Sequence, residues 1–338
     1  MVNHFTGPVG VEIVGVGTAV PDDVVTNADL EKFMDTSDEW IRQRTGIEQR
    51  HRIRADEGES VKHLAKAAAE NAMAHAGIDP SELDLVVMST MSAEMTCPPT
   101  SCRIADEIGT KNAGAFDLNA ACCGFVFGMN TAYGLMQTGQ YRTVALIGAD
   151  TLTNIVEFST KGRNAAIIFG DAAGAVILRK TDDAGKGLIA QAMHSNGERW
   201  SDLYIPETEH DFAEHDEYSD WQLGKLIMNG QSVFKFAVGT FPKVIEQTLE
   251  RAGLRADQVD HYVCHQSNRR ILDAARDRFG LDEGRFHINI NRYANTVAAS
   301  VPLVFKDLVD AGRVKEGQRV MFVGFGGGLT WGTSLWQI

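Results

Sequence analysis

Two adjacent cysteines, Cys122 and Cys123, lie where one predicted element gives way to another. The chain leaves a short strand at Leu118, passes through small residues and enters an apolar helical run, 125–136. A thiol at such an elbow sits at a helix N-terminus, where free backbone N–H groups stabilise a thiolate and can face an oxyanion. Adjacent cysteines among alanines are also common as small buried residues. The elbow alone therefore leaves both readings open.

Three further segments hold residues that could work with a thiol. His265 follows a predicted strand and opens a polar helix, and Asn295 stands just before the helical run 297–309. A glycine turn, 326–328, follows another strand and would let backbone N–H groups approach a substrate. Each segment also has a plain structural reading: a histidine at a strand end, an N-cap and a flexible loop.

The elements that must position these residues belong to the α/β class. Runs of β-branched and apolar residues alternate with helical stretches, which is typical of a buried sheet covered by helices. The best-defined helix is 60–76, with Ser60 as its N-cap and Gly77 as its stop. The clearest predicted strands are 11–16, 83–88, 144–147, 259–264 and 320–323.

A faint internal repeat predicts two similar halves. The helix end and strand at 76–87 recur at 252–263, and the strand 145–148 recurs at 321–324, so both are repeated at one spacing (76 to 252 and 145 to 321). We expect an N-terminal half, 1–180, with the cysteines and a C-terminal half, 181–338, with His265 and Asn295, related by a pseudo-twofold axis.

Composition narrows the classes of protein. The 338 residues are 44% hydrophobic and 23% charged, values that exclude a disordered or fibrous chain, and the net charge of −13 argues against nucleic acid or an anionic membrane as partner. No signal-peptide pattern opens the sequence, so we expect a cytoplasmic protein. Five cysteines without paired C-x-x-C motifs favour neither a disulfide framework nor a metal site. The segment 207–220 holds seven acidic residues and no Lys or Arg, and we expect it to be a solvated loop.

Six segments, taken in order, form a more specific pattern. They are TSDEWIRQRTGI at 36–47, AACCGF at 120–125, FGDAAGA at 169–175, HQSN at 265–268, NT at 295–296 and GFGGG at 324–328. The pattern resembles that of the β-ketoacyl-acyl-carrier-protein synthase III family, in the thiolase superfamily, over essentially the whole chain. The resemblance implies a duplicated five-layer α-β-α-β-α fold, which agrees with the internal repeat.

The resemblance also implies a reaction. Cys122 would take an acyl group from acyl-coenzyme A (acyl-CoA), and His265 and Asn295 would bind the thioester carbonyl of malonyl-acyl carrier protein and stabilise the enolate formed as carbon dioxide leaves. The backbone N–H groups of Cys122 and Gly327 would form the oxyanion hole. The product would be a 3-oxoacyl-carrier protein that initiates fatty acid synthesis, with no metal and no cofactor besides the two thioester substrates.

Two binding regions follow from the same resemblance. Trp40 and Arg163 match residues that hold the adenine of CoA, and Arg44, close to Trp40 in the sequence, would serve polar or phosphate contacts. A basic patch would suit an acidic carrier protein, although Asp273 and Asp277 dilute it and a salt-bridged helix surface is the competing reading. The patch consists of Lys235, Arg269, Arg270, Arg276 and Arg278.

Three positions depart from the family pattern. Ala294 replaces a usual glycine before the catalytic asparagine, and Cys123 replaces a usual Ala or Ser. Cys97 stands where some relatives place a Phe that reaches across a homodimer and closes the acyl pocket. We expect the smaller Cys97 to act as a roomier gate, so that primers longer than acetyl are accepted.

Other functions use the same residue types. Relatives with this fold transfer acyl groups to oxygen or nitrogen, or condense them in secondary metabolism. A Cys-His-Asn hydrolase needs similar chemistry, and a scaffold that binds acyl carrier protein with inert cysteines is a non-enzymatic alternative. Retention of both His265 and Asn295 favours decarboxylative condensation.

Overall fold

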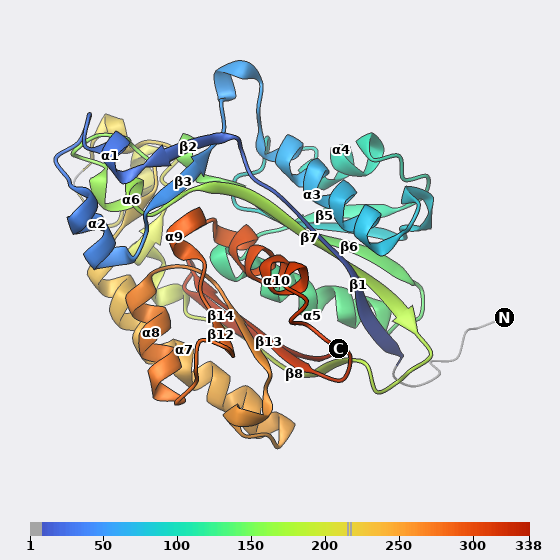
Figure 1. Ribbon diagram of the computed structural model, residues 1–338. Coiled ribbons are helices and arrows are strands. Elements are labelled where there is room, and N and C mark those ends of the chain that lie inside the picture. Colours follow the sequence, from blue (N-terminus) through green and yellow to red (C-terminus); the bar gives the residue numbers. More distant parts are fainter. Residues whose placement is uncertain (1–8, 215, 217) are drawn as a thin grey trace.

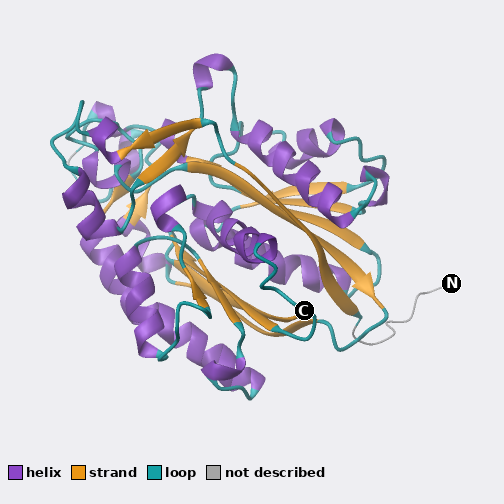
Figure 2. Ribbon diagram, viewed as in Figure 1, coloured by secondary structure: helices purple, strands orange, loops and turns teal. Residues whose placement is uncertain are grey.

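Two five-stranded sheets and three helical layers build the molecule. The computed structural model describes residues 9–214, 216 and 218–338. In Figure 1, helices α5 (Gly124–Met136) and α10 (Ser300–Asp310) lie between the sheets. Helices α3 (Val61–Ala76) and α4 (Thr100–Glu107) cover the outer face of one sheet, and α7 (Gly230–Ala252) and α8 (Arg269–Arg278) cover that of the other (Figure 2). The predicted five-layer α-β-α-β-α fold is confirmed.

The first sheet comes from the N-terminal part of the chain. Its spatial order is β1 (Gly10–Ala19), β7 (Asp171–Thr181), β6 (Thr143–Thr151), β4 (Leu85–Ser89) and β5 (Gly114–Leu118). The strands β6, β4 and β5 run parallel to one another, whereas β7 is antiparallel to both β6 and β1. The residues of β4 and β6 are buried throughout, as expected for strands covered on both faces.

The second sheet repeats this arrangement. Its order is β8 (Gly187–Ser195), β14 (Thr330–Gln337), β13 (Arg319–Gly326), β11 (His261–Cys264) and β12 (Phe286–His287). The strands β13, β11 and β12 run parallel to one another, whereas β14 is antiparallel to both β13 and β8, as β7 is to its two neighbours in the first sheet. The two sheets therefore share one order and one set of directions, as the internal repeat predicts.

Small residues let helix α3 lie close against the first sheet. Ala65, Ala68 and Ala72 are fully buried on its inner face. A Cβ atom added to Gly17 of β1 would lie 2.2 Å from the backbone nitrogen of Ala72, so this contact requires glycine. Ser60 occupies the N-cap position, as predicted, but its hydroxyl bonds to Glu94 instead of capping the helix.

Shorter elements complete the chain. Helical ones are α1 (Asn27–Leu30), α2 (Asp38–Thr45), α6 (Arg163–Ala166) and α9 (Ile290–Tyr293), and the short strands are β2 (Asp23–Thr26), β3 (Gln49–Arg52), β9 (Leu203–Tyr204) and β10 (Ile227–Met228). The 3-10 turns are η1 (Ala55–Glu57), η2 (Pro80–Glu82), η3 (Ala121–Cys123), η4 (Leu152–Asn154), η5 (Gly197–Asp202), η6 (Glu209–Asp211), η7 (Asp220–Gln222), η8 (Ala256–Gln258) and η9 (Val297–Ala299).

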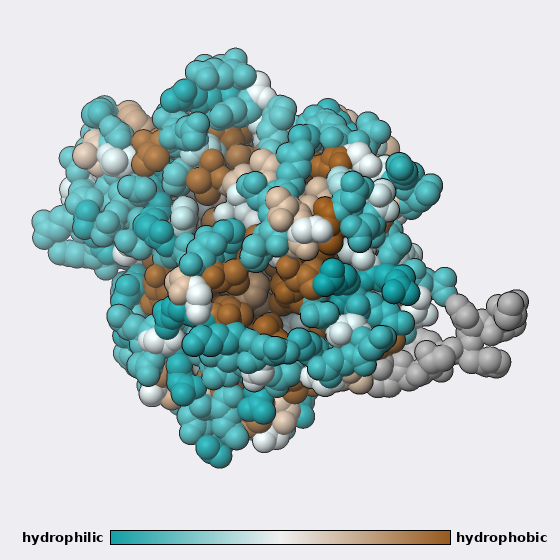
Figure 3. All heavy atoms as spheres, turned by 45° about the vertical axis from the view of Figure 1, so that its right-hand side comes forward, coloured by the Kyte–Doolittle hydropathy of each residue, from teal (hydrophilic) through white to brown (hydrophobic). Residues whose placement is uncertain are grey.

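The predicted elements are present with shifted ends. The helix predicted to start at 125 starts at Gly124, after the turn η3, and the one predicted to start at 297 begins as the turn η9 and becomes the α-helix α10 at Ser300. The helix after His265 starts only at Arg269, capped by Asn268. Among the described residues no helix has the length and apolar character needed to cross a membrane. Figure 3 shows one face, largely hydrophilic, with apolar residues gathered in a hollow at its centre.

Candidate active site

Cys122 lies at a tight elbow between β5 and α5. The turn η3 carries it, and the preceding Ala121 has a φ of +46°, a conformation that is rare for a residue with a side chain. The side chain of Asn119 holds the elbow by accepting a hydrogen bond from the N–H of Ala121 at 3.1 Å. On the other side of the turn, a Cβ atom added to Gly124 would lie 1.9 Å from the hydroxyl oxygen of Ser89, so a larger residue would clash there. Crowding on both sides of the turn thus fixes the position of the thiol.

The glycine turn closes over the same thiol. A Cβ atom on Gly326 would lie 2.7 Å from the Cβ of Cys122 and 3.1 Å from its Sγ, so only glycine fits there. The backbone N–H groups of Cys122 and Gly327 act on the sulfur and lower its pKa.

The thiol nevertheless rests in its protonated form. Burial, followed by the charge of Asp150, raises the pKa of Cys122 to about 12, and these two effects outweigh the backbone N–H groups. The backbone N–H groups act in the direction expected at a helix N-terminus, but burial outweighs them, and the sequence does not reveal how deeply the thiol is buried.

His265 lies at the end of β11, fully enclosed. Its backbone N–H donates a hydrogen bond to the carbonyl of Val323 at 2.8 Å, and Phe325 packs edge-on against its ring. Burial lowers the pKa of His265 to about 3, so the imidazole is neutral across the physiological range. Its Nδ1 lies 2.7 Å from the hydroxyl of Ser300. Nε2 is the ring nitrogen left for a ligand.

Asn295 is held with its amide nitrogen free to donate. Its Oδ1 accepts a hydrogen bond from the N–H of Val297 at 2.9 Å, which assigns Nδ2 to the other side. The residue before it, Ala294, has φ +59° and ψ −157°, a region that strongly favours glycine. Alanine at position 294 therefore puts backbone strain directly beside Asn295.

These three side chains meet at one cavity of about 90 Å³, here called the inner cavity. Cys122 comes from the first half of the chain, whereas His265 and Asn295 come from the second. Apolar groups make up most of the remaining wall, which keeps the space dry and strengthens polar interactions inside it. The other lining residues are Ile168, Phe169, Leu203, Met228, Gly230, Val233, Phe234, Ser267, Asn268, Ile271, Phe325 and Gly326.

Two larger spaces adjoin the inner cavity. One of about 620 Å³, the acyl chamber, shares Cys122, Phe169 and Leu203 with it and extends past Ile155 and Leu226. The other, also about 620 Å³, is the entrance chamber and shares residues such as Phe234 and Asn268 with the inner cavity. The thiol thus stands between a space that could hold an acyl group and a space that reaches the surface.

The predicted CoA-binding residues meet at the entrance chamber. Trp40 and Arg44 line it, and the guanidinium carbons of Arg44 and Arg163 lie 4.6 Å and 4.9 Å from the centre of the Trp40 ring. Arg163 also donates to the carbonyl of Asp35. An aromatic ring with two guanidinium planes is suited to stacking on a flat base.

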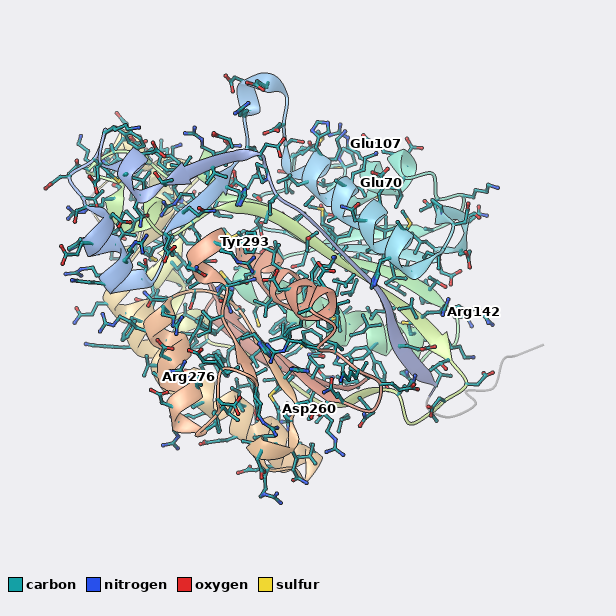
Figure 4. The ribbon with its side chains drawn as sticks, in the orientation of Figure 1. Glu70, Glu107, Arg142, Asp260, Arg276 and Tyr293 are labelled. Atoms are coloured by element: carbon teal, nitrogen blue, oxygen red, sulfur yellow. The ribbon has the colours of Figure 1, made fainter. Side chains whose placement is uncertain are left out.

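Two arginines of the predicted basic patch are held in ion pairs with acidic residues. Arg269 and Arg276 both pair with Asp273 and Glu283, with N–O distances between 2.9 and 3.5 Å, and Arg276 also pairs with Asp277. Figure 4 shows Arg276 on the outer side of the molecule. The acidic partners neutralise much of the charge of this part of α8.

The other part of the patch lies beside the entrance chamber. Arg270 is exposed, lines that chamber and has its guanidinium 5.1 Å from the ring centre of Phe234. Lys235, the next residue after Phe234 on α7, is also exposed. These two residues of the patch therefore keep exposed positive charge at or next to the entrance chamber.

Other sequence predictions had mixed outcomes. Cys97 is exposed and does not line the acyl chamber of its own chain, whereas Met91 to Ala93 of the same loop do. Cys123 is fully buried, and burial raises the pKa of its thiol, so it is the less accessible of the two cysteines. Most of the acidic segment is exposed, as expected, but Glu207 lines the acyl chamber. Within that segment Glu217 lies outside the described residues.

Sequence reasoning missed two polar groups beside the site. Asp150 accepts hydrogen bonds from the N–H groups of Met91 and Ala298 and from two hydroxyls, and burial raises its pKa to about 6. Ser300 contacts the imidazole of His265. Neither could be found from local sequence, because each acts on residues that are distant along the chain. In the described part of the chain, no three His, Cys, Asp or Glu residues are grouped to hold a metal ion.

Known proteins resemble this chain over nearly its whole length. Two family models match, "3-Oxoacyl-[acyl-carrier-protein (ACP)] synthase III" over residues 116–197 and its C-terminal counterpart over residues 249–338. A β-ketoacyl-[acyl-carrier-protein] synthase III from Clostridium acetobutylicum is 39% identical over 96% of this chain and 97% of its own length.

Solved structures of similar proteins have the same fold along nearly their whole length. The 3-oxoacyl-[acyl-carrier-protein] synthase III of Aquifex aeolicus VF5 is 33% identical with a TM-score of 0.88, covering 97% of this chain and all of that one. A priming β-ketosynthase of the R1128 polyketide biosynthetic pathway is equally similar, at 33% identity, TM-score 0.88 and 98% of both chains.

Proposed function

Because the chain belongs to the 3-oxoacyl-[acyl-carrier-protein] synthase III family, we propose that it condenses an acyl-CoA primer with malonyl-acyl carrier protein. The products are carbon dioxide, free CoA and a 3-oxoacyl-carrier protein, and the reaction initiates fatty acid synthesis. The observation that carries the proposal is the meeting of Cys122, His265 and Asn295 at one cavity between an acyl chamber and an entrance.

Cys122 forms the acyl-enzyme in the first half-reaction. Its sulfur attacks the thioester carbonyl, and the N–H groups of Cys122 and Gly327 stabilise the oxyanion. The intermediate collapses with release of the CoA sulfur, which ends as a thiol with the proton that Cys122 loses. Since the thiol of the free enzyme rests protonated, proton loss has to accompany the attack.

His265 and Asn295 act in the second half-reaction. Nε2–H of His265 and Nδ2–H of Asn295 donate to the thioester carbonyl of the malonyl group, and carbon dioxide leaves as the electron pair moves onto the α-carbon and carbonyl oxygen. That carbon then attacks the acyl thioester, and the Cys122 sulfur leaves and regains a proton that is taken up from solvent. Two neutral donors in a dry cavity stabilise the enolate without a fixed cation.

The entrance chamber receives both substrates, because CoA and acyl carrier protein each present the acyl group on a phosphopantetheine arm. Trp40 and Arg163 would stack on the adenine of CoA, with Arg44 close to its polar groups. For the carrier protein we assign the larger role to Arg270 and Lys235, since acidic partners already neutralise Arg269 and Arg276.

We assign the acyl chamber to the primer. Its volume of about 620 Å³ and the apolar side chains in its wall, such as Ile155 and Leu226, support primers longer than acetyl. Cys97, exposed in one chain, would bear on this chamber only from the second copy of a homodimer. The division into halves 1–180 and 181–338, a cytoplasmic location and a reaction with no metal or added cofactor belong to the same proposal.

One alternative has a specific observation in its favour. The R1128 priming β-ketosynthase is as similar as the 3-oxoacyl-[acyl-carrier-protein] synthase III of Aquifex aeolicus VF5, so a primer for secondary metabolism is the second candidate. The chemistry of the site would be the same, and the pathway would differ.

A primer series tests the function. Acyl-CoA thioesters from acetyl to octanoyl are each incubated with malonyl-acyl carrier protein, and the 3-oxoacyl product is measured for wild type and Cys122→Ala. We expect product from at least one primer in wild type and none in Cys122→Ala. Free fatty acid without condensation would indicate a hydrolase, and acetyl as the sole active primer would refute the assignment of longer primers.

A further inference from the structure

His265 can perform its proposed task in only one of its two neutral forms. A neutral imidazole carries one N–H, and donation to the malonyl thioester requires that proton on Nε2, the nitrogen left for the cavity. Nδ1 must therefore carry no hydrogen if His265 is to donate to the malonyl thioester. Among the described residues, the hydroxyl of Ser300 lies 2.7 Å from Nδ1, and the backbone of Val297 also acts on the ring, in the direction that raises the pKa of His265.

Ser300 lies at the start of α10 and is 1% exposed. Its oxygen is also 3.3 Å from the N–H of Gln266, which can only donate, and 2.9 Å from the carbonyl of Val297, which can only accept. The single hydroxyl proton thus has two acceptors to choose between. If it goes to Nδ1, Nε2 carries hydrogen; if it goes to Val297, Nδ1 must carry hydrogen and Nε2 is bare.

The same short segment also orients Asn295. Val297 donates its N–H to the Oδ1 of Asn295, and its carbonyl faces Ser300. Val297 has a φ of +50°, which is strongly disfavoured for a β-branched residue. Together with Ala121 and Ala294 it is one of three non-glycine residues with positive φ in the described part of the chain, and all three lie within two positions of Cys122 or Asn295.

We propose that Ser300 is a positioning residue that donates its hydroxyl proton to Nδ1 of His265 and so holds Nε2–H toward the cavity during decarboxylation. The inference rests on the proposed function and deepens it: a segment of six residues, 295–300, presents both donors to the enolate oxygen. Formation of the acyl-enzyme uses Cys122 and backbone N–H groups, so it does not depend on this proton.

The test compares Ser300→Ala and Ser300→Thr with wild type. We expect Ser300→Ala to lower malonyl-carrier decarboxylation at least tenfold while the rate of Cys122 acylation changes less than threefold, and Ser300→Thr, which keeps the hydroxyl, to recover most of the loss. Ser101→Ala, which removes a fully buried hydroxyl on α4, is the matched control and should change neither rate. Equal loss of both rates in Ser300→Ala, or no loss, would overturn the proposal.

A spectroscopic arm makes the result independent of turnover. The ¹⁵N shifts of labelled histidine, assigned with His265→Gln, report which ring nitrogen carries the proton. We expect Nε2–H in wild type and a shift toward Nδ1–H in Ser300→Ala. The Nδ1–H form in wild type would overturn the proposal, whereas a wild-type enzyme with Nε2–H that forms no 3-oxoacyl product would instead overturn the proposed function.

Discussion

The contact between Gly124 and Ser89 supports a paired substitution with a sharp outcome. Gly124 has ordinary helical angles (φ −58°, ψ −41°), so alanine would suit its backbone and raise helix propensity. The obstacle is one atom, because the new Cβ would lie 1.9 Å from the Oγ of Ser89 but 3.2 Å from its Cβ. Removal of that oxygen turns a severe clash into a tight contact.

The magnitudes follow from this geometry. Gly124→Ala alone should cost about 2–3 kcal/mol of unfolding free energy through overpacking, and should slow acylation of Cys122 at least tenfold, since the elbow must move. Ser89→Ala removes a buried hydroxyl that has no hydrogen-bond partner among the described residues, so it should be neutral or slightly stabilising. In the double variant we expect a favourable coupling of about 2 kcal/mol and acylation within threefold of wild type.

The assays are chemical denaturation and the rate of acyl transfer from acyl-CoA, measured on all four proteins of the cycle. Ser89→Ala serves as the control for loss of the hydroxyl alone. Additive effects, with the double variant as impaired as Gly124→Ala, would show that the clash with Ser89 is not what requires glycine at this position.

Three further predictions concern the same site. Gly326→Ala should leave no detectable acylation, measured by mass spectrometry, because its Cβ would lie 2.7 Å from that of Cys122; acylation at the wild-type rate would contradict the geometry. Trp40→Ala should raise KM for acyl-CoA by roughly tenfold through lost stacking and leave KM for acyl-N-acetylcysteamine, which has no adenine, unchanged; an equal rise for both would refute the assignment. The pKa of His265 is about 3 in the folded protein and near 6.5 when unfolded, so its neutral form stabilises the fold above pH 6.5, and this contribution is lost as pH falls toward 3. Denaturation of His265→Gln between pH 6.5 and 4 should therefore show a shallower pH dependence, by about 1.4 kcal/mol per pH unit, and an unchanged slope would contradict the burial of a neutral imidazole.

Local sequence was sufficient for the architecture but not for the electrostatics. The alternation of strands and helices and the repeat from 76 to 252 predicted the paired sheets, because periodicity and helix stops are local properties. The cysteine elbow, His265 and Asn295 each follow a strand or precede a helix, so their places could be inferred. Their meeting at one cavity is a consequence of the sheet order, which no single segment encodes.

Contacts between distant segments account for what the sequence did not reveal. The raised pKa of Cys122 depends on burial and on Asp150, which lies on another strand. The role of Ser300 depends on its 2.7 Å contact with a histidine 35 residues away. The partial neutralisation of the basic patch could not be predicted, because it depends on Glu283, which lies after the end of α8 and folds back to pair with Arg269 and Arg276.

The most direct test of the account is intact-protein mass spectrometry of the acyl-enzyme. Wild type, Cys122→Ala and Cys123→Ala are incubated with acyl-CoA thioesters, and malonyl-acyl carrier protein is then added. We predict one acyl adduct that is lost only in Cys122→Ala and that is discharged as a 3-oxoacyl-carrier protein. An adduct that persists in Cys122→Ala, or no adduct with any thioester, would contradict the assignment of Cys122 as the nucleophile.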